Sequence, residues 1–441
     1  SSPWPFLGRA TLNFSLDPAS TKKTELESKN CLGTGSKWLP DEQVYTAAAR
    51  MKWNPTKALR DWLEARFELE PVVRLLRENL TKPVPAHVNW LFTLGSVLAA
   101  LLAVQLFTGV LLMVHYKPSG QEAFQSVQHI TYDVPLGWLI RSAHNWGSHL
   151  IVVLALLHLA RVLVYGGYKK PRELTWGVGV ALLAIILGFG FTGYLLPWDQ
   201  VAYWATVVAT EAPASIPVVG PLTREFMIGG TEVADPTLGR FYVVHVILLP
   251  FALIALVGLH LLLIRYHGTS PLSGTDQPEP GADEIYRQGG KPFLPHHALK
   301  DSAAIYVAIG ALMSLALLLP PHLGDMADPL ITPPGIKPEW YFLPAYQLLK
   351  YVPEVVGVNM PPLLLLILVL LPLAIDTSPE RHPGRRPRVV TGWIVTSVLI
   401  LGLGILGHLS ETTRTVLGTA YHFDVKGMPH VVEITDGEGQ D

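Results

Sequence analysis

Long apolar runs, separated by polar or proline-rich connections, dominate the chain from about residue 90 onward. A helix of about 20 apolar residues is long enough to cross the hydrocarbon core of a bilayer. Seven runs reach this length, although the fifth is compact and the sixth is flanked by prolines, so their ends are the least sharply marked. The predicted spans are residues 90–115, 138–164, 176–196, 241–264, 302–320, 356–375 and 389–408.

The first 88 residues have a different pattern. Between residues 40 and 88, apolar residues such as Leu59, Trp62 and Phe67 interleave with charged ones, which is typical of an amphipathic helix lying at a membrane interface. Residues 1–39 show no clear periodicity and are interpreted as an extended arm. The first 80 residues hold no apolar run long enough for a signal peptide, so we expect the amino terminus to stay in the cytoplasm.

Composition supports a membrane protein. Of the 441 residues, 49% are hydrophobic and only 15% are charged, whereas about 25% are charged in ordinary soluble domains. We therefore predict an all-α integral membrane protein, with a four-helix bundle followed by three further transmembrane helices. The predicted parts are an amino-terminal extension, an amphipathic segment, the bundle, a cytoplasmic linker, the three-helix unit and a polar tail, at 1–39, 40–88, 89–266, 267–300, 301–410 and 411–441.

Charge and cysteine content exclude several classes of function. A formal net charge of -2 predicts no nucleic-acid partner, and the single cysteine, Cys31, cannot build a disulfide framework, an iron-sulfur cluster or a cysteine-rich zinc site. Basic residues gather after the second, fourth and sixth spans, which the positive-inside rule assigns to the cytoplasm. The carboxyl terminus then lies outside. The long connections 197–240 and 321–355 also face outward, where we expect short helices along the membrane surface.

Four histidines occur as two pairs within the apolar spans. His144 and His158 lie on the second span, and His245 and His260, one position further apart, lie on the fourth. On a regular helix the histidines of the second span are about 21 Å apart along the axis, and the angle between them falls about 40° short of four full turns. Those of the fourth span are about 22 Å apart, and the angle between them exceeds four turns by about 60°. Imidazole is a common axial ligand of haem iron. Two such helices side by side predict two haem sites at two depths of a membrane.

Each histidine, considered alone, also has a structural interpretation that involves no metal. An isolated intramembrane histidine more often hydrogen-bonds to a neighbouring helix than binds a metal, but polar residues in a bilayer are costly and the repeated spacing favours ligation. His149, about 140° around the helix from His144, is assigned no iron. The histidines at or near the interfaces are expected to be solvated; they are His115, His129, His267, His296 and His297.

Glycines repeat the period of the histidines. Gly95 and Gly109 on the first span, and Gly179 and Gly193 on the third, are separated by the same interval as His144 and His158. We interpret them as clearance for a haem macrocycle lying against the helix backbone. The alternative is the packing of small residues that is common between membrane helices.

Two arginines flank the histidines of the second span. Arg141 comes shortly before His144, and Arg161 follows His158 at the same short interval. A guanidinium group is suited to holding carboxylates, so we expect these arginines to bind the haem propionates. The alternative is a pair of interfacial arginines that extend to the membrane surface.

Four longer motifs lie between residues 80 and 410. They are Trp-Leu-Ile-Arg-Ser-Ala-His at 138–144, Lys-Pro-Arg-Glu-Leu-Thr-Trp at 170–176, Gly-Tyr-Leu-Leu-Pro-Trp-Asp-Gln at 193–200 and Pro-Glu-Trp-Tyr at 338–341. Together they resemble the cytochrome b subunit of cytochrome bc complexes, including the chloroplast-type bf branch. The last motif is similar to a specific signature of that family's quinol oxidation site.

Several details resemble the bf branch. Its split protein pair has in the fourth helix the longer ligand spacing seen here from His245 to His260, with three helices after it, so this chain looks like the two pieces fused, with 265–300 as the junction. Thr93 stands where that branch has a cysteine that holds an extra c-type haem, and Cys31 does not replace it by position, so a third haem is not expected. The pair Lys300-Asp301 resembles the respiratory branch instead, whereas Arg265 resembles the bf pattern.

The resemblance implies a quinol oxidation site at the outer face. Glu339 stands in an apolar neighbourhood next to Pro338 and Trp340, where it would accept and pass on protons. Taken alone, Glu339 is also consistent with a loop carboxylate near a helix start. The implied hydrogen-bonding or packing partners of the quinol are Tyr194, Tyr341 and Tyr346.

The resemblance also implies a path for electrons. One electron of the quinol goes to a Rieske iron-sulfur protein and onward to a c-type cytochrome. The other passes through two b-type haems, a low-potential one held by His144 and His245 and a high-potential one held by His158 and His260.

A second, inner site is implied as well, where a quinone would be reduced near Arg265, Lys300 and Asp301. The net effect is proton release outside and uptake inside. The family further implies a homodimeric complex in contact with lipid, and we expect a bacterial-type inner membrane.

Two other classes of function remain open from the residues alone. A simpler dihaem membrane anchor would explain the histidines, but it would not explain residues 338–341 or the last three spans. A haem-free transporter would use the histidines in a proton path.

Overall fold

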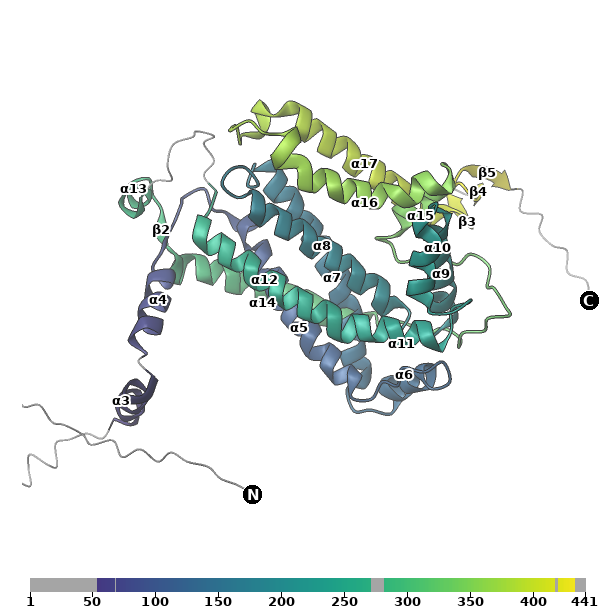
Figure 1. Ribbon diagram of the computed structural model, residues 1–441, viewed down its shortest axis with the longest axis horizontal. Coiled ribbons are helices and arrows are strands. Elements are labelled where there is room, and N and C mark those ends of the chain that lie inside the picture. Colours follow the sequence, from purple (N-terminus) through teal and green to yellow (C-terminus); the bar gives the residue numbers. More distant parts are fainter. Residues whose placement is uncertain (1–53, 68, 271–280, 417–418, 433–441) are drawn as a thin grey trace, which may run out of the picture. The chain divides into compact units, whose positions relative to one another are not determined.

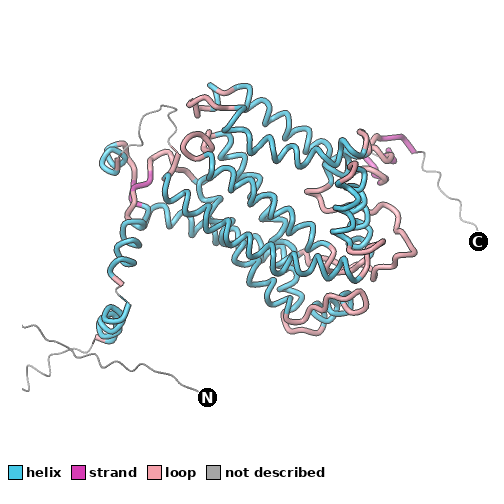
Figure 2. Tube along the Cα trace, viewed as in Figure 1, coloured by secondary structure: helices cyan, strands magenta, loops and turns pink. Residues whose placement is uncertain are grey.

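The computed structural model of the chain describes residues 54–67, 69–270, 281–416 and 419–432. The predicted arm 1–39, with Cys31, therefore lies outside the described residues. Helices dominate the described parts (Figure 2). Seven of them are long and apolar enough to cross a membrane, and each predicted span corresponds to one. They are Trp90–Met113, Gly137–Val164, Glu173–Tyr194, Asp235–His267, Phe293–Leu318, Glu354–Ile375 and Pro387–Leu409.

These spans contain the main helices of Figure 1. The spanning helices are α5 (Leu94–Met113), α7 (Gly137–Val164), α8 (Glu173–Tyr194), α12 (Leu249–His267), α14 (Ala298–Leu318), α16 (Glu354–Leu370) and α17 (Pro387–Leu409). Shorter helices are α6 (Ala123–Tyr132), α9 (Gln200–Glu211), α10 (Val219–Ile228), α11 (Asp235–Val243), α13 (Ala282–Arg287) and α15 (Leu343–Leu349).

The amphipathic segment contains two helices where one was predicted, α3 (Pro55–Phe67) and α4 (Glu70–Leu80). On α3 the charged face is organised by an ion pair of Arg60 with Glu64, one turn away. The apolar side chains Leu59, Trp62 and Phe67 are each at least half exposed. Exposed apolar side chains on a helix with a charged face agree with an interfacial helix, which stays a prediction.

Four helices form the central bundle. α5 packs along α7, α12 packs along α8, and α7 contacts α8 (Figure 1). The remaining spans cover this bundle from outside, since α14 lies on α5 and α7, and α16 lies on α8. A shared apolar core joins the two sets, with Leu101, Ile151 and Val180 from the bundle packed against Leu312 and Leu368. The predicted architecture of four helices followed by three is therefore confirmed.

We call the end of the bundle that carries the connections 197–240 and 321–355 the outer end. There α9, α10 and α11 gather with α6 around a second apolar core that includes Leu195, Trp198 and Leu238. The prediction of short helices in the 197–240 connection is confirmed, and α6 is an additional one that the apolar runs did not predict.

The predicted polar tail contains an antiparallel sheet of three strands, β3 (Thr412–Val416), β4 (Thr419–Phe423) and β5 (Pro429–Val432), in that order. In its register, Thr412 pairs with Phe423 and His422 with His430. The carbonyl of Lys426, in the turn between β4 and β5, accepts hydrogen bonds from Gln347 of α15 and from Tyr351. A shorter pair, β1 (Pro83–Val84) with β2 (Lys291–Pro292), links two distant connections.

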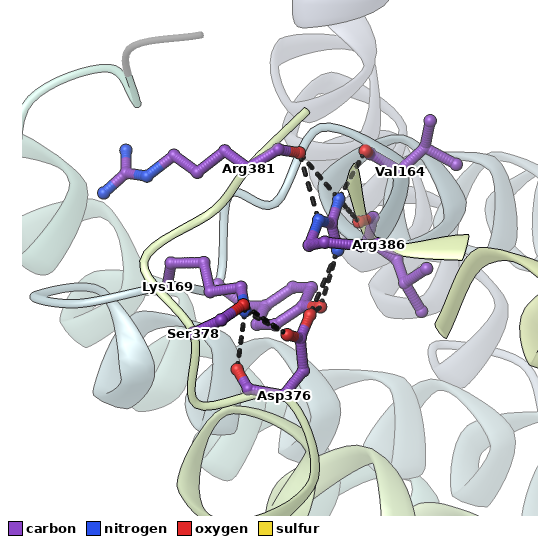
Figure 3. Close-up of polar contacts among 8 residues, drawn as sticks. Val164, Lys169, Asp376, Ser378, Arg381 and Arg386 are labelled. Atoms are coloured by element: carbon purple, nitrogen blue, oxygen red, sulfur yellow. Dashed lines mark hydrogen bonds and ion pairs between the residues drawn. The ribbon is translucent and has the colours of Figure 1, made fainter. Parts of the chain in front are cut away.

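Buried charges join the bundle to the last helices at the opposite, inner end. Figure 3 shows Lys169, from the connection after α7, and Arg386, at the start of α17, on either side of Asp376. Tyr168 also donates to Asp376, and Arg386 donates to the carbonyl of Arg381 at 2.8 Å. All of these side chains are at most 8% exposed. Burial alone would raise the pKa of Asp376, but the hydrogen bonds from Lys169 and Tyr168 lower it below its ordinary value.

Candidate functional site

Each histidine of the two pairs points across to a glycine of the neighbouring helix. A methyl group on Gly109 or Gly95 of α5 would come within 3.3 or 3.5 Å of the Cε1 atom of His144 or His158. On α8, the same change at Gly193 or Gly179 would reach 2.5 or 3.3 Å from Cε1 of His245 or His260. The four glycines therefore accommodate the edges of the four imidazoles. Clearance for a macrocycle remains our interpretation of the space beyond them.

The unequal spacing of the two pairs is reconciled by the backbone. His245 lies in a wide π turn, Val244–Leu248, between α11 and α12, and the amide of Leu249 donates to the carbonyl of Val244 one π turn before it. Such a turn holds one residue more than an α-helical turn. The longer separation of His245 and His260 therefore closes four turns almost as well as the shorter one on α7 does. The overshoot of about 60° expected for a regular helix is thus taken up, and both rings face α8.

The outer pair, His144 and His245, has ring centroids 6.4 Å apart with 69° between the ring planes. The hydroxyl of Thr108 lies 2.9 Å from Nδ1 of His144, and that of Thr192 lies 3.1 Å from Nδ1 of His245. Each hydroxyl also donates its own proton to a carbonyl one turn earlier, at 2.8 Å. Each threonine must then accept from the histidine, so Nδ1 carries the proton and Nε2 keeps a lone pair.

This arrangement fits a metal held between two imidazoles. A free Nε2 is the ligating form of histidine, and a backbone or side-chain acceptor at Nδ1 is the usual support of such a ligand. The separation of 6.4 Å between ring centroids is about what two metal–nitrogen bonds of about 2 Å and the two ring radii require. Within the described residues, metal-ligating side chains do not cluster in groups of three or more. A porphyrin, which supplies four ligands itself, suits paired histidines.

The two arginines predicted to hold carboxylates differ in their surroundings. The Arg161 guanidinium stacks on the ring of Phe92, 3.5 Å from its centroid, and its Nε is buried without a hydrogen-bond partner in the part of the chain that the structure describes. Arg141 instead donates to the carbonyl of Pro321 at 3.0 Å. The unsatisfied Nε of Arg161 therefore fits an acidic group of a ligand beside His158.

Thr108 and Thr192 are residues that the sequence reasoning missed. Each directly precedes the glycine that faces an outer histidine, so the dipeptide Thr-Gly occurs at both positions. Leu94 and Val178 precede the inner glycines, so they provide no such acceptor. The repeated dipeptide was the signal that could have identified both threonines.

The motif at residues 338–341 packs between α7 and α8 next to the outer pair. A methyl group on Gly190 of α8 would lie 2.8 Å from the hydroxyl of Tyr341, so this hydroxyl rests on the helix backbone one turn from Gly193. The indole of Trp340 donates to Nδ1 of His149 at 3.0 Å. Burial, assisted by Glu339, raises the pKa of Tyr341 above its ordinary value, so the hydroxyl stays protonated at neutral pH.

The other two tyrosines predicted for this site lie in different surroundings. Tyr194, at the end of α8, lies within electrostatic range of Glu339 and Tyr341. Tyr346 lies on α15, where its ring is 4.7 Å from the ammonium group of Lys350 and where burial, with a smaller effect from Glu411, raises its pKa. The structure therefore brings Tyr194 toward the motif and gives Tyr346 other neighbours.

The inner residues also separate. Asp301 of α14 lies 3.6 Å from Nε2 of His297, and Ser96 of α5 is a hydrogen-bonding neighbour of the same carboxylate. The His297 side chain is only 14% exposed, so the prediction that it is solvated was wrong. Its ring lies between Asp301 of α14 and the ring of Phe293, whose centroid is 5.7 Å away, and these contacts cover it. Lys300 is half-buried, and Arg265 is exposed at the end of α12.

Comparisons with known proteins agree with these observations. The sequence model of a family described as "Cytochrome b/b6/petB" matches residues 79–268. A second, described as "Cytochrome b(C-terminal)/b6/petD", matches residues 326–423. These descriptions include both branches named above, so they fit the bf-like fusion and the respiratory form equally.

Individual relatives cover most of the chain. "Cytochrome b" of Rickettsia bellii (strain RML369-C) is 37% identical over 363 residues, which are 81% of this chain and 88% of that protein. "Cytochrome b/c1" of Bradyrhizobium diazoefficiens is 34% identical over 363 residues, 80% of this chain and 51% of that longer protein. A solved structure described as "Hyperthermophilic respiratory Complex III" is 32% identical, with a TM-score of 0.70, and covers 80% of this chain and 92% of that one.

Proposed function

The chain belongs to the cytochrome b family, as the cytochrome b subunit of a bc complex, and on this premise we propose that it oxidises quinol at its outer end and reduces quinone at its inner end. A Rieske iron-sulfur protein would take one electron from each quinol, and two b-type haems bound by this chain would supply one-electron carriers for the other. The observation that supports this most directly is the outer pair of facing histidines, with the Glu339 motif packed one helical turn away.

The haem-binding residues follow from the paired rings. His144 and His245 would hold the outer haem, and His158 and His260 would hold the inner one. When bound, the haems supply one-electron carriers at two depths of the membrane. Thr108 and Thr192 orient the outer imidazoles, and Arg161 offers its unsatisfied Nε to a carboxylate beside the inner pair.

The protons are handled by residues of the outer motif. Oxidation of a quinol to a quinone releases two electrons and two protons, so a base must lie beside the substrate. The carboxylate of Glu339 can accept a proton, whereas the buried hydroxyl of Tyr341 stays protonated and acts as a hydrogen-bond donor. Pro338 and Trp340 complete the connection that holds these two side chains between α7 and α8.

Quinone reduction at the inner end consumes two electrons and two protons. Asp301 is the best supported of the three proposed residues there, because its carboxylate is near both His297 and Ser96. Lys300, next to Asp301 in the sequence, and Arg265, exposed at the end of α12, are the two cations included in the proposal. Uptake of protons at this end and their release at the outer end would move protons across the membrane.

The proposed partners are a Rieske protein and a c-type cytochrome, in a dimeric complex in a bacterial-type inner membrane. The similar solved structure is a respiratory Complex III by its description, and the Bradyrhizobium relative is named "Cytochrome b/c1". Both names support a multisubunit assembly around this chain.

Glu339→Gln tests the proposed oxidation site. We expect turnover with a short-chain quinol to fall by about 10- to 100-fold, since a general base contributes about 100-fold or more and other groups would replace part of it. Glu354→Gln, an exposed carboxylate in the first turn of α16, is the matched control and should keep full turnover. Undiminished activity of Glu339→Gln would reject the assigned base and favour the simpler membrane anchor.

Thr192→Val should raise the midpoint potential of the outer haem by about 20 to 60 mV. The hydrogen bond that His245 donates makes this ligand more basic, which favours the oxidised iron. A hydrogen bond contributes about 1 kcal/mol, which is less than a tenfold change in an equilibrium constant. For a one-electron couple a tenfold change equals about 59 mV, so the expected shift lies near or below that value. A redox titration followed at the haem absorption bands measures the shift. Thr192→Ser keeps a hydroxyl and serves as the control. An unchanged or lowered potential in the valine variant would show that this hydroxyl does not tune the site.

A further inference from the structure

His149 is a polar side chain on a membrane-spanning helix that takes part in neither histidine pair. It lies on α7 about 140° around from His144, so it faces away from the helix that carries Gly95 and Gly109. The side chain is only 17% exposed. A half-buried imidazole in such a position requires hydrogen-bonding partners, because an unsatisfied polar group in a membrane is costly.

Most of its neighbours in the described structure are residues of the motif at 338–341. Trp340 donates its indole N–H to Nδ1 of His149 at 3.0 Å, and Oε2 of Glu339 lies 4.0 Å from the same nitrogen. The ring of Tyr341 is 6.2 Å away, and Trp146 flanks the imidazole on its own helix with 5.4 Å between centroids. Trp340 and His149 are 191 residues apart in the sequence. The fold alone joins this histidine to the motif.

The hydrogen bond from Trp340 determines the protonation of the imidazole. An indole N–H can only donate, so Nδ1 of His149 must be an acceptor and the neutral ring carries its proton on Nε2. A lone pair on Nδ1 therefore lies 4.0 Å from a carboxylate oxygen of Glu339. As long as Glu339 is ionised, these two acceptors cannot hydrogen-bond to each other. Once Glu339 gains a proton, its O–H becomes a donor and needs to move by only about 1 Å to reach hydrogen-bonding distance from Nδ1.

On the basis of the proposed quinol oxidation, we propose that His149 is a proton-relay residue, which accepts from Glu339 the proton that Glu339 removes from the quinol. In this step the O–H bond of the Glu339 carboxylic acid breaks and an N–H bond forms at Nδ1 of His149. The carboxylate is regenerated, and the imidazole becomes a cation. Trp340 must release its hydrogen bond from Nδ1 for this transfer. No electron changes place in the step, so it needs no further reactant.

The neighbourhood is suited to such a transfer. Among the residues that the structure describes, the titratable side chains in contact with His149 are Glu339 and Tyr341, from the same connection, and the protonated Tyr341 adds no charge. Tyr194, from the end of α8, lies within electrostatic range of Glu339. After Glu339 has passed its proton to His149, its carboxylate is negative and stabilises the adjacent imidazolium, since opposite charges at this distance attract. Glu339 can then accept the second proton of the quinol.

The test is His149→Asn in the purified complex, with a short-chain quinol as substrate. The asparagine oxygen can occupy the region of Nδ1 and keep the hydrogen bond from Trp340, but the amide cannot carry a proton. We expect kcat to fall about 5- to 20-fold, with KM and the haem absorption bands unchanged, since a general base typically contributes more than this. The pH profile of kcat should differ from that of the wild type, and added imidazole should restore part of the rate. His129→Asn, an exposed histidine in α6, is the matched control.

A double variant distinguishes a shared path from independent effects. If Glu339 and His149 act in series, His149→Asn combined with Glu339→Gln should be no slower than Glu339→Gln alone, because groups acting as a unit are not additive. Wild-type kcat and pH dependence in His149→Asn would overturn the relay, while a slow Glu339→Gln would leave the proposed oxidation site intact. Wild-type rates in both variants would reject the oxidation site itself. Loss of the haem bands in both His149→Asn and His149→Gln would also overturn the relay, since it would show that the imidazole is needed for assembly.

Discussion

His245→Leu should leave the purified complex with one of the two proposed b-type haems per chain. Leucine removes the side chain that faces His144 across the outer pair, where the ring centroids are 6.4 Å apart. A single imidazole cannot complete six-coordinate iron, and the partner Thr192 loses its hydrogen bond at the same time. We expect the low-potential absorption band to disappear and quinol turnover to be lost. The measurements are a pyridine haemochrome assay and a reduced-minus-oxidised spectrum.

The matching changes distinguish the two depths. His260→Leu should remove the inner, high-potential band and leave the outer one, whereas His149→Leu should keep both haems because its ring faces the Glu339 motif. Loss of both bands in every histidine variant would contradict the pairing of α7 with α12 at two separate levels. If no variant changed the spectrum, the proposed haem sites would be wrong and the transporter alternative would gain support.

Asp376→Asn should destabilise the chain by about 3 to 5 kcal/mol, the usual effect of removing one partner from a buried ion pair. Asp376 forms ion pairs with Lys169 and Arg386 and accepts a hydrogen bond from Tyr168, so the substitution leaves two buried cations without their counter-charge. The substitution weakens the contact between the bundle and α17. We therefore expect the melting temperature of the solubilised complex to fall by several degrees. Glu122→Gln is the control, because its ion pair with Lys117 is exposed and contributes little.

The pH dependence of this contribution follows from the direction of the shift. The folded-state pKa of Asp376 is lowered, so the unfolded chain binds this proton more tightly than the folded one. The stabilisation is therefore complete above the ordinary carboxyl pKa of about 3.9 and is lost as the pH falls through the lower folded value. Replacing both Lys169 and Asp376 by apolar residues should recover part of the loss. A melting temperature for Asp376→Asn equal to that of Glu122→Gln would show that the buried cluster does not hold the two parts together.

The parts of the protein that were predictable from sequence are those with a local physical cause. A membrane span is a run of apolar residues whose length is set by the bilayer, so all seven appear in the sequence and in the structure. The period shared by the histidines of α7 and the glycines reflects the pitch of single helices, and each glycine does lie against a histidine. The Pro338 to Tyr341 motif was visible as four adjacent letters, although its packing partners were not.

Helix geometry beyond the regular α-helix was not predictable in this way. The longer spacing of His245 and His260 predicted an offset between their rings, because a uniform pitch was assumed. The π turn at Val244–Leu248 absorbs the additional residue, and Pro250 just after it lacks the amide that a regular turn would use. Whether a helix widens at one turn depends on how its neighbours hold it.

The sequence by itself therefore determined the membrane spans, the paired histidines with their glycines, and the motif that carries Glu339. Only the tertiary structure decided that His149 belongs to that motif, that Thr108 and Thr192 orient the outer imidazoles, and that Lys169 meets Asp376. These contacts join residues from 36 to 207 positions apart. The free energy of a side-chain contact depends on the distance between the side chains in space. The periodicity of residues along one helix does not specify which other helix packs against it.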